Sequence, residues 1–226
     1  MADAQAVKRF WKTVAVENGT ILLDGRIVKT PGRTTLSLPT AQLATAIADE
    51  WRAVGEIIKP HEMPLTGLAN AATERAPLPA TLAVYGETDL LCYRAETPPE
   101  LAAREAQIWD PLLEWARARF DIAFNVTSGI IHCAQPPETV RRLGAAVAAY
   151  DDFHRTALSP LVTIGGSLVV ALMLAEGAIT TDAAFDACHL DELWQAELWG
   201  EDWMATDARA ARRADFDAAA RFLTLL

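Results

Sequence analysis

The sequence contains few cysteines and no excess of positive charge. Its 226 residues include three cysteines, an odd number at wide spacing. This pattern excludes a disulfide framework and favours a reducing compartment. There are 20 Lys and Arg residues against 30 Asp and Glu residues, which gives a formal net charge of −10. Nucleic acids and anionic lipid surfaces need a basic partner, so neither is expected to bind this protein.

Long apolar segments are also missing. The most apolar run, residues 161–175, is interrupted by Gly165-Gly166-Ser167 and is too short to cross a bilayer. It predicts a buried core helix over residues 161–176. Residues 1–10 contain neither an apolar core nor an Arg- and Ser-rich presequence. We therefore expect no targeting segment, no membrane insertion and a soluble cytoplasmic protein.

Motifs for cofactors and covalent catalysis do not occur either. There is no GxxxxGK[ST] or GxGxxG phosphate loop, and no GxSxG motif surrounds a nucleophile such as Cys92. The adjacent pairs His132-Cys133 and Cys188-His189 do not have the spacing of zinc ligands. The sequence thus predicts no cofactor and no metal, and it shows no local sign of nucleophilic catalysis.

Turn signals divide the first forty residues into short β-prone segments. Asn18-Gly19, Asp24-Gly25 and Pro31-Gly32 are the turns, and Asn-Gly or Asp-Gly between such segments is typical of hairpins. The segments are residues 13–17, 21–24, 26–30 and 34–38. Thr40 can then cap a helix that runs to Trp51. We expect an antiparallel meander with this helix packed on one face.

From about residue 65 onward the sequence is helical. Proline and glycine divide it into expected helices over residues 65–75, 80–94, 100–120, 137–150, 151–158, 161–176, 181–199 and 202–226. The predicted fold class is α+β: a small N-terminal domain with a β meander and a helix, followed by a larger all-α C-terminal domain. The predicted domains are residues 1–76 and 77–226.

Residues 190–203 are the most unusual segment, with three tryptophans and five acidic residues. At about 100° per residue, one apolar helical stripe contains Leu193, Glu197, Leu190, Trp194 and Leu198. Glu197 lies within it, with Leu193 on one side and Leu190 and Trp194 on the other. An isolated carboxylate there is costly, so it must be paired, protonated or offered to a partner. Glu192 lies about 140° away, which makes a shared proton or metal awkward. An ion pair is one solution, and the candidate cations are Arg141, Arg142, Arg155 and Arg212.

Recognition of a partner is the other solution. Trp199 lies opposite the stripe and beside Glu192, so residues 199–203 predict an exposed aromatic and acidic corner at a helix end. Tryptophan supplies large contact area in protein interfaces, and an exposed one therefore points to a partner. The candidate partner-binding residues are Asp191, Glu192, Glu197, Trp199, Gly200 and Trp203.

Several strings, taken in order over residues 8–203, resemble one family. They are RFWK at 9–12, LDGRIVKTP at 23–31, LPT at 38–40, EW at 50–51, MPLT at 63–66, LAN at 68–70, DLLCYR at 89–94, WDPLL at 109–113, GSLV at 166–169 and DELWQAELWGED at 191–202. Together they resemble the assembly chaperones of the F-type ATP synthase that bind the alpha subunit of its catalytic head.

The resemblance implies a non-enzymatic chaperone that binds the free alpha subunit transiently, prevents its aggregation and gives way to the beta subunit. It also implies a functional glutamate in the string at 195–200, which falls on Glu197. Such proteins act in the bacterial cytoplasm, or in the mitochondrial matrix for eukaryotic relatives, and we expect a monomer when free. The alternatives are a small-molecule enzyme that uses Glu197 as a general acid or base, and a structural adaptor that stays in the finished complex.

Overall fold

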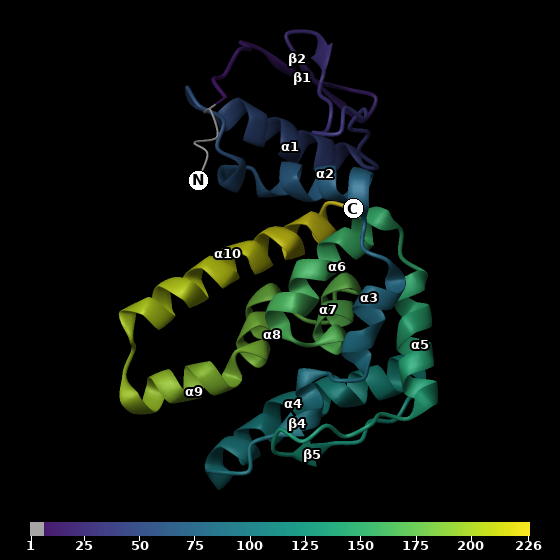
Figure 1. Cartoon of the computed structure of the whole chain (residues 1–226), viewed down its shortest axis with the longest axis vertical. Coiled ribbons are helices and arrows are strands. Elements are labelled where there is room, and N and C mark those ends of the chain that lie inside the picture. The colour runs from purple at the N-terminus through teal and green to yellow at the C-terminus, as the bar shows by residue number, and fades with distance from the viewer. Residues whose placement is uncertain (1–6) are drawn as a thin grey trace.

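The computed structural model describes residues 7–226. The expected absence of a targeting segment concerns residues 1–10, of which residues 1–6 lie outside the described residues. Figure 1 shows a small β-containing unit above a larger helical body, which confirms the predicted α+β class. Within the described residues, none of the helices is both long enough and apolar enough to cross a membrane.

The N-terminal strands form the expected antiparallel meander. Strands β1 (Val14–Glu17), β2 (Thr20–Leu23) and β3 (Arg26–Ile27) pair in sequence order. Asn18 and Gly19 both have positive φ, 49° and 74°, which matches the twist of a two-residue hairpin turn. Residues 34–38 join the meander only through isolated bridges, at Thr35 and Ser37.

Helix α1 (Ala41–Ala53) covers one face of this sheet, and α2 (Pro64–Arg75) packs against α1 (Figure 1). Helix α1 begins as predicted, because the Thr40 hydroxyl accepts the Leu43 amide at 3.1 Å. A 3₁₀ turn, η1 (Pro60–Glu62), leads to α2. The Glu50 carboxylate of α1 accepts two backbone amides of the first turn of α2, each at 2.8 Å. It satisfies donors that a helix start otherwise leaves unpaired.

The rest of the chain is mainly helical. Its elements are α3 (Pro79–Ala83), η2 (Val84–Gly86), η3 (Leu90–Cys92), β4 (Tyr93–Arg94), α4 (Pro99–Phe120), β5 (Thr127–Ser128), α5 (Pro137–Ala148), α6 (Asp152–Gly165), α7 (Leu168–Ala175), α8 (Thr181–Cys188), α9 (Leu190–Trp199) and α10 (Trp203–Thr224). Trp109, Leu113 and Phe216 are among the buried residues of this core.

Helix α10 connects the two parts of the molecule. It runs from the α9–α10 turn back to the C-terminus beside α2 (Figure 1). Phe222, near its end, is fully buried in the same core as Ile21 and Leu43 of the N-terminal unit. The boundary after residue 76 stays a prediction.

The expected helix over residues 80–94 is wrong. Helix α3 ends at Ala83, and the chain continues through η2 and η3 into β4. Asp89 is fully buried, and its two oxygens accept the amides of Leu91 at 3.1 Å and Val169 at 3.0 Å. A side chain that ties its own backbone to α7 competes with the helical hydrogen bonds.

The expected break at Pro160 is also wrong. Helix α6 continues through Pro160 and ends at Gly165, with Gly166, whose φ is 68°, as its C-cap. Ser167 then caps α7. Left-handed glycine stops a helix more effectively here than proline does, because Pro160 removes only one hydrogen bond. Similarly, the helix expected over residues 181–199 is divided at His189 into α8 and α9.

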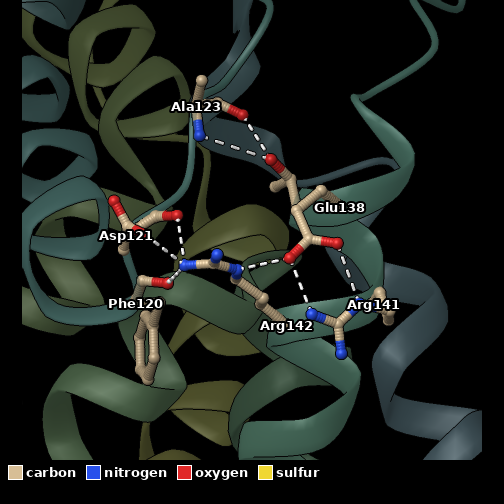
Figure 2. Close-up of polar contacts among 7 residues, drawn as sticks. Phe120, Asp121, Ala123, Glu138, Arg141 and Arg142 are labelled. Carbon is tan, nitrogen blue, oxygen red and sulfur yellow. Dashed lines mark hydrogen bonds and ion pairs between the residues drawn. The ribbon is translucent and has the colours of Figure 1, made fainter.

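Charged side chains join the end of α4 to the start of α5 (Figure 2). Arg142 donates to the carbonyls of Phe120 at 3.2 Å and Asp121 at 2.8 Å, which lie at the C-terminal end of α4. Glu138 accepts from Arg141 and from Arg142, each at 2.6 Å, and these two cations lower the pKa of its carboxyl to about 2. Both arginines are therefore engaged far from Glu197.

Candidate functional site

The turn between α9 and α10 lies at the outer edge of the molecule (Figure 1). Helix α9 ends as predicted at Gly200, with φ 84° and ψ 165°, a region that only glycine adopts readily. Asp202 then starts α10 by accepting the amides of Met204 and Ala205, both at 3.0 Å. Gly200 and Asp202 therefore fix the angle between the two helices.

Four large apolar side chains are exposed around this turn. They are Leu198, Trp199, Trp203 and Met204, between 55% and 78% exposed, and we call them the corner patch. The exposure of Trp199 and Trp203 was expected. Leu198 was placed on the apolar stripe of α9, and that placement is wrong, because burial is lost along the helix from Leu190, which is 4% exposed.

Glu197 forms a two-pronged ion pair with Arg104 of α4. The Nη1–Oε2 distance is 2.5 Å and the Nη2–Oε1 distance is 2.9 Å, and the pairing lowers the pKa of the Glu197 carboxyl. The Arg104 guanidinium also lies 5.5 Å from the centre of the Trp194 ring. More than half of the Glu197 side chain stays exposed to solvent, so it is paired at the surface rather than buried in the stripe.

The ion pair was expected, but its partner was not. Arg212 binds Glu192, Arg155 binds Asp152, and Arg141 and Arg142 bind Glu138. Arg104 lies 93 residues before Glu197, and nothing in the spacing of the sequence shows that α4 packs beside α9.

Glu192 faces α10 and does not belong to the corner patch. It lies 2.5 Å from Arg212 and 3.4 Å from Arg209, and Arg209 also reaches Glu201 at 2.9 Å. Arg209 is largely buried. The Arg209 guanidinium thus connects α9, the turn and α10, and it stabilises the shape of the turn. Sequence reasoning missed this residue.

Asp191 adjoins Glu105 of α4, and its carboxyl group helps to raise the pKa of Glu105. Glu105 is 1% exposed and accepts the Ala95 amide at 2.7 Å. Burial raises the pKa of the Glu105 carboxyl to about 7, and the adjacent carboxyl of Asp191 contributes in the same direction. Two carboxyl groups this close favour sharing one proton.

A groove of about 560 Å³ lies between α4, α8 and α9, beside Glu197. Its apolar lining is Ile108, Ala183, Ala187, Leu190, Leu193 and Ala196, and its charged lining is Arg104, Asp186, Glu197 and Glu201. Within residues 7–226 there is no group of three or more His, Cys, Asp or Glu side chains arranged to hold a metal ion.

The groove supplies the concave site that an enzyme would require, but the Glu197 carboxylate is not suited to act as its general acid or base. A general acid or base works best with a pKa near the working pH. Arg104 moves the pKa of Glu197 in the opposite direction, further below that range. The geometry therefore favours a binding role for this groove.

The structure divides the six predicted site residues among three places. Trp199, Gly200 and Trp203 lie at the α9–α10 turn, and Glu197 lies in the adjacent groove. Asp191 and Glu192 hold α9 against α4 and α10. Sequence reasoning missed Arg104, Arg209 and Met204. Of these, only Met204 had a signal in the sequence, because it directly follows Trp203, which was already predicted to be exposed.

The fold matches that of known chaperones. Atp12 from Paracoccus denitrificans is 42% identical with a TM-score of 0.92, covering 98% of both chains. The Atu1473 protein from Agrobacterium tumefaciens is 38% identical with a TM-score of 0.90, covering 96% of this chain and 85% of that one. The fold is thus that of known molecular chaperones.

The sequence relationship agrees with the structural one. Residues 8–117 match the family described as ATP12 chaperone protein. The mitochondrial protein atp12 of Schizosaccharomyces pombe is 28% identical over 85% of this chain and 74% of its own length. The chain belongs to the ATP12 chaperone family, and its resemblance to the ATP synthase assembly chaperones is confirmed.

Proposed function

We propose that this protein binds the free alpha subunit of the F-type ATP synthase, prevents its aggregation and yields it to the beta subunit during assembly. Membership of the ATP12 family supports assembly of this enzyme as the process. The observation that carries the proposal is the corner patch, four exposed apolar side chains on a turn whose shape is fixed by hydrogen bonds and ion pairs.

The corner has the layout of a protein-binding hot spot. Trp199 and Trp203 supply contact area with little conformational entropy to lose, and carboxylates of Glu201 and Asp202 adjoin them. Apolar surface of this kind on a monomer calls for a partner.

The size of the site suits a client that must leave. Stable complexes bury roughly 800 Å² on each partner, more than four side chains on one turn supply alone. A small patch extended by the neighbouring groove gives binding that a competing subunit can replace. We therefore infer transient binding by a monomeric protein in the bacterial cytoplasm. The related structures from Paracoccus and Agrobacterium are also of bacterial proteins.

Co-expression with each ATP synthase subunit separately tests this function. Alpha expressed without beta should become soluble and co-purify with the chain, whereas beta expressed alone should not. The double variant Trp199→Ala/Trp203→Ala should lose alpha and still fold, because both rings are mainly exposed. Ile130→Ser is the matched control: Ile130 is 99% exposed in the loop before α5, and its loss should leave alpha bound.

Three outcomes would refute the proposal. The first is no complex with alpha at micromolar concentrations. The second is equal capture of beta, which would remove the client specificity. The third is a stoichiometric amount of this chain in the mature ATP synthase, which would make it a structural adaptor.

A further inference from the structure

We infer that the groove between α4, α8 and α9 binds a client segment with apolar side chains beside an arginine, and that Arg104 occupies Glu197 until the client's arginine replaces it. The identity of the client rests on the proposed function. The chemistry of the groove does not.

The floor of the groove is apolar and unfilled. Leu190 is buried beneath it, while Ile108 and Leu193 are partly exposed along its walls. A volume of about 560 Å³ lies in the range of sites that hold a bound molecule of several side chains' size. Water in an apolar groove of this size is readily displaced by apolar side chains, which gives the segment its first requirement.

The rim of the groove is acidic and sets the second requirement. Three carboxylates, Asp186, Glu197 and Glu201, line the groove against one guanidinium, that of Arg104, which leaves a formal charge of −2. Glu201 is shared with Arg209, which lies outside the groove. A cationic segment is therefore complementary to this groove, and an acidic one is repelled.

A client arginine can replace Arg104 in the ion pair with Glu197 at little cost in free energy. Both side chains are more than one-third exposed, and an ion pair in that much water contributes little net stability. Arg104 also has a second partner, because its guanidinium lies over the Trp194 ring, and that contact can remain when Glu197 is released. The planar two-pronged geometry at Glu197 is one that arginine reproduces and lysine does not.

The groove is continuous with the corner. Glu201 lines both this groove and the smaller hollow between α9 and α10 that contains Trp199 and Gly200. A client seated on the corner patch can therefore extend a neighbouring segment into the groove. The two surfaces together form one interface along α9.

A peptide panel tests the groove independently of the client. The panel is a set of leucine-rich peptides that differ at one central position, Arg, Gln or Glu, with binding measured by fluorescence anisotropy. Purified alpha subunit is measured in parallel. The arginine peptide should bind the wild-type protein, and the glutamate peptide should not.

Variants of this chain determine where the arginine peptide binds. Ala183→Trp fills the groove from an exposed position on α8 and should weaken binding about tenfold or more. Ala148→Trp, an exposed alanine at the end of α5, is its control. Glu197→Gln should weaken binding, whereas Glu176→Gln, which breaks the comparable pair with Arg119 at 2.6 Å, should not.

The direction in which Arg104→Met changes the binding affinity is the decisive result. Methionine keeps the apolar stem beside Trp194 but frees Glu197, so the arginine peptide and alpha should bind up to about fivefold more tightly. Arg119→Met makes the same change of net charge at the control pair and should have no effect.

Two results would overturn the inference. One is binding that is unchanged by Ala183→Trp. The other is binding weakened by Arg104→Met as much as by Glu197→Gln, which would make the pair purely structural. Failure of alpha to bind the wild-type protein would instead refute the proposed function, and the peptide panel would still decide the groove.

Discussion

Glu105→Gln should remove a loss of stability that the wild-type protein shows as the pH rises. Glu105 is buried at the junction of α4 and α9, where it accepts the Ala95 amide and contacts the carboxyl of Asp191. Ionisation of Glu105 therefore places a charge in a low-dielectric site beside a second carboxylate. Glutamine keeps the same shape, the acceptor for Ala95 and a donor for Asp191, without the charge.

The size and sign follow from the pKa. In the folded protein the pKa of Glu105 is raised from its ordinary value of 4.5 to about 7. Between these values the unfolded chain has released the proton that the folded chain still holds, so the free energy of unfolding falls as the pH rises. At 1.36 kcal/mol per pKa unit, the loss is up to about 3 kcal/mol once both states are ionised.

Urea unfolding at several pH values between 4.5 and about 8 measures this loss. The Glu105→Gln variant should equal the wild type at the acidic end and exceed it by up to about 3 kcal/mol at the alkaline end. Glu114→Gln, an exposed carboxylate of the same helix, is the control and should follow the wild-type curve. A Glu105→Gln curve parallel to that of the wild type, or less stable at high pH, would refute the reasoning.

Three further substitutions test the supports of the fold and of the site. Asp89→Asn should cost about 1–3 kcal/mol despite its equal size, because each carboxylate oxygen accepts a separate buried amide and the new NH₂ group would face one of them. Trp109→Phe should cost about 1–3 kcal/mol or more, since its indole nitrogen donates to the buried Ala187 carbonyl at 2.8 Å; urea unfolding checks both, and values near zero would contradict them. Gly200→Ala should cost about 1–3 kcal/mol and reduce alpha capture, whereas Gly177→Ala, at a helix end outside the site, should preserve capture; equal capture by both variants would show that the angle of the turn does not matter.

The sequence by itself determined the features that depend on a few neighbouring residues. The Asn18-Gly19 hairpin, the Thr40 cap and the stop at Gly200 were all predicted, because turn and cap geometry is set within about four residues. The exposure of Trp199 and Trp203 followed in the same way from helical periodicity and the adjacent stop.

Errors arose where a local signal competed with a distant contact. Pro160 is tolerated inside α6, and Asp89 draws residues 89–92 out of the expected helix through its bond to α7. Propensity and proline placement are weak compared with a buried polar group that must find its partners. No spacing within residues 80–94 encodes the position of α7.

Only the tertiary structure decided the chemistry of the candidate site. The sequence showed that Glu197 needs a partner, but the packing of α4 against α9 selected Arg104, and the same packing formed the groove and the Glu105–Asp191 contact. Patterns along one helix tell which face a side chain occupies. The cation, the carboxyl group and the empty volume that meet that face come from segments far away in the chain, and they are brought together only by folding.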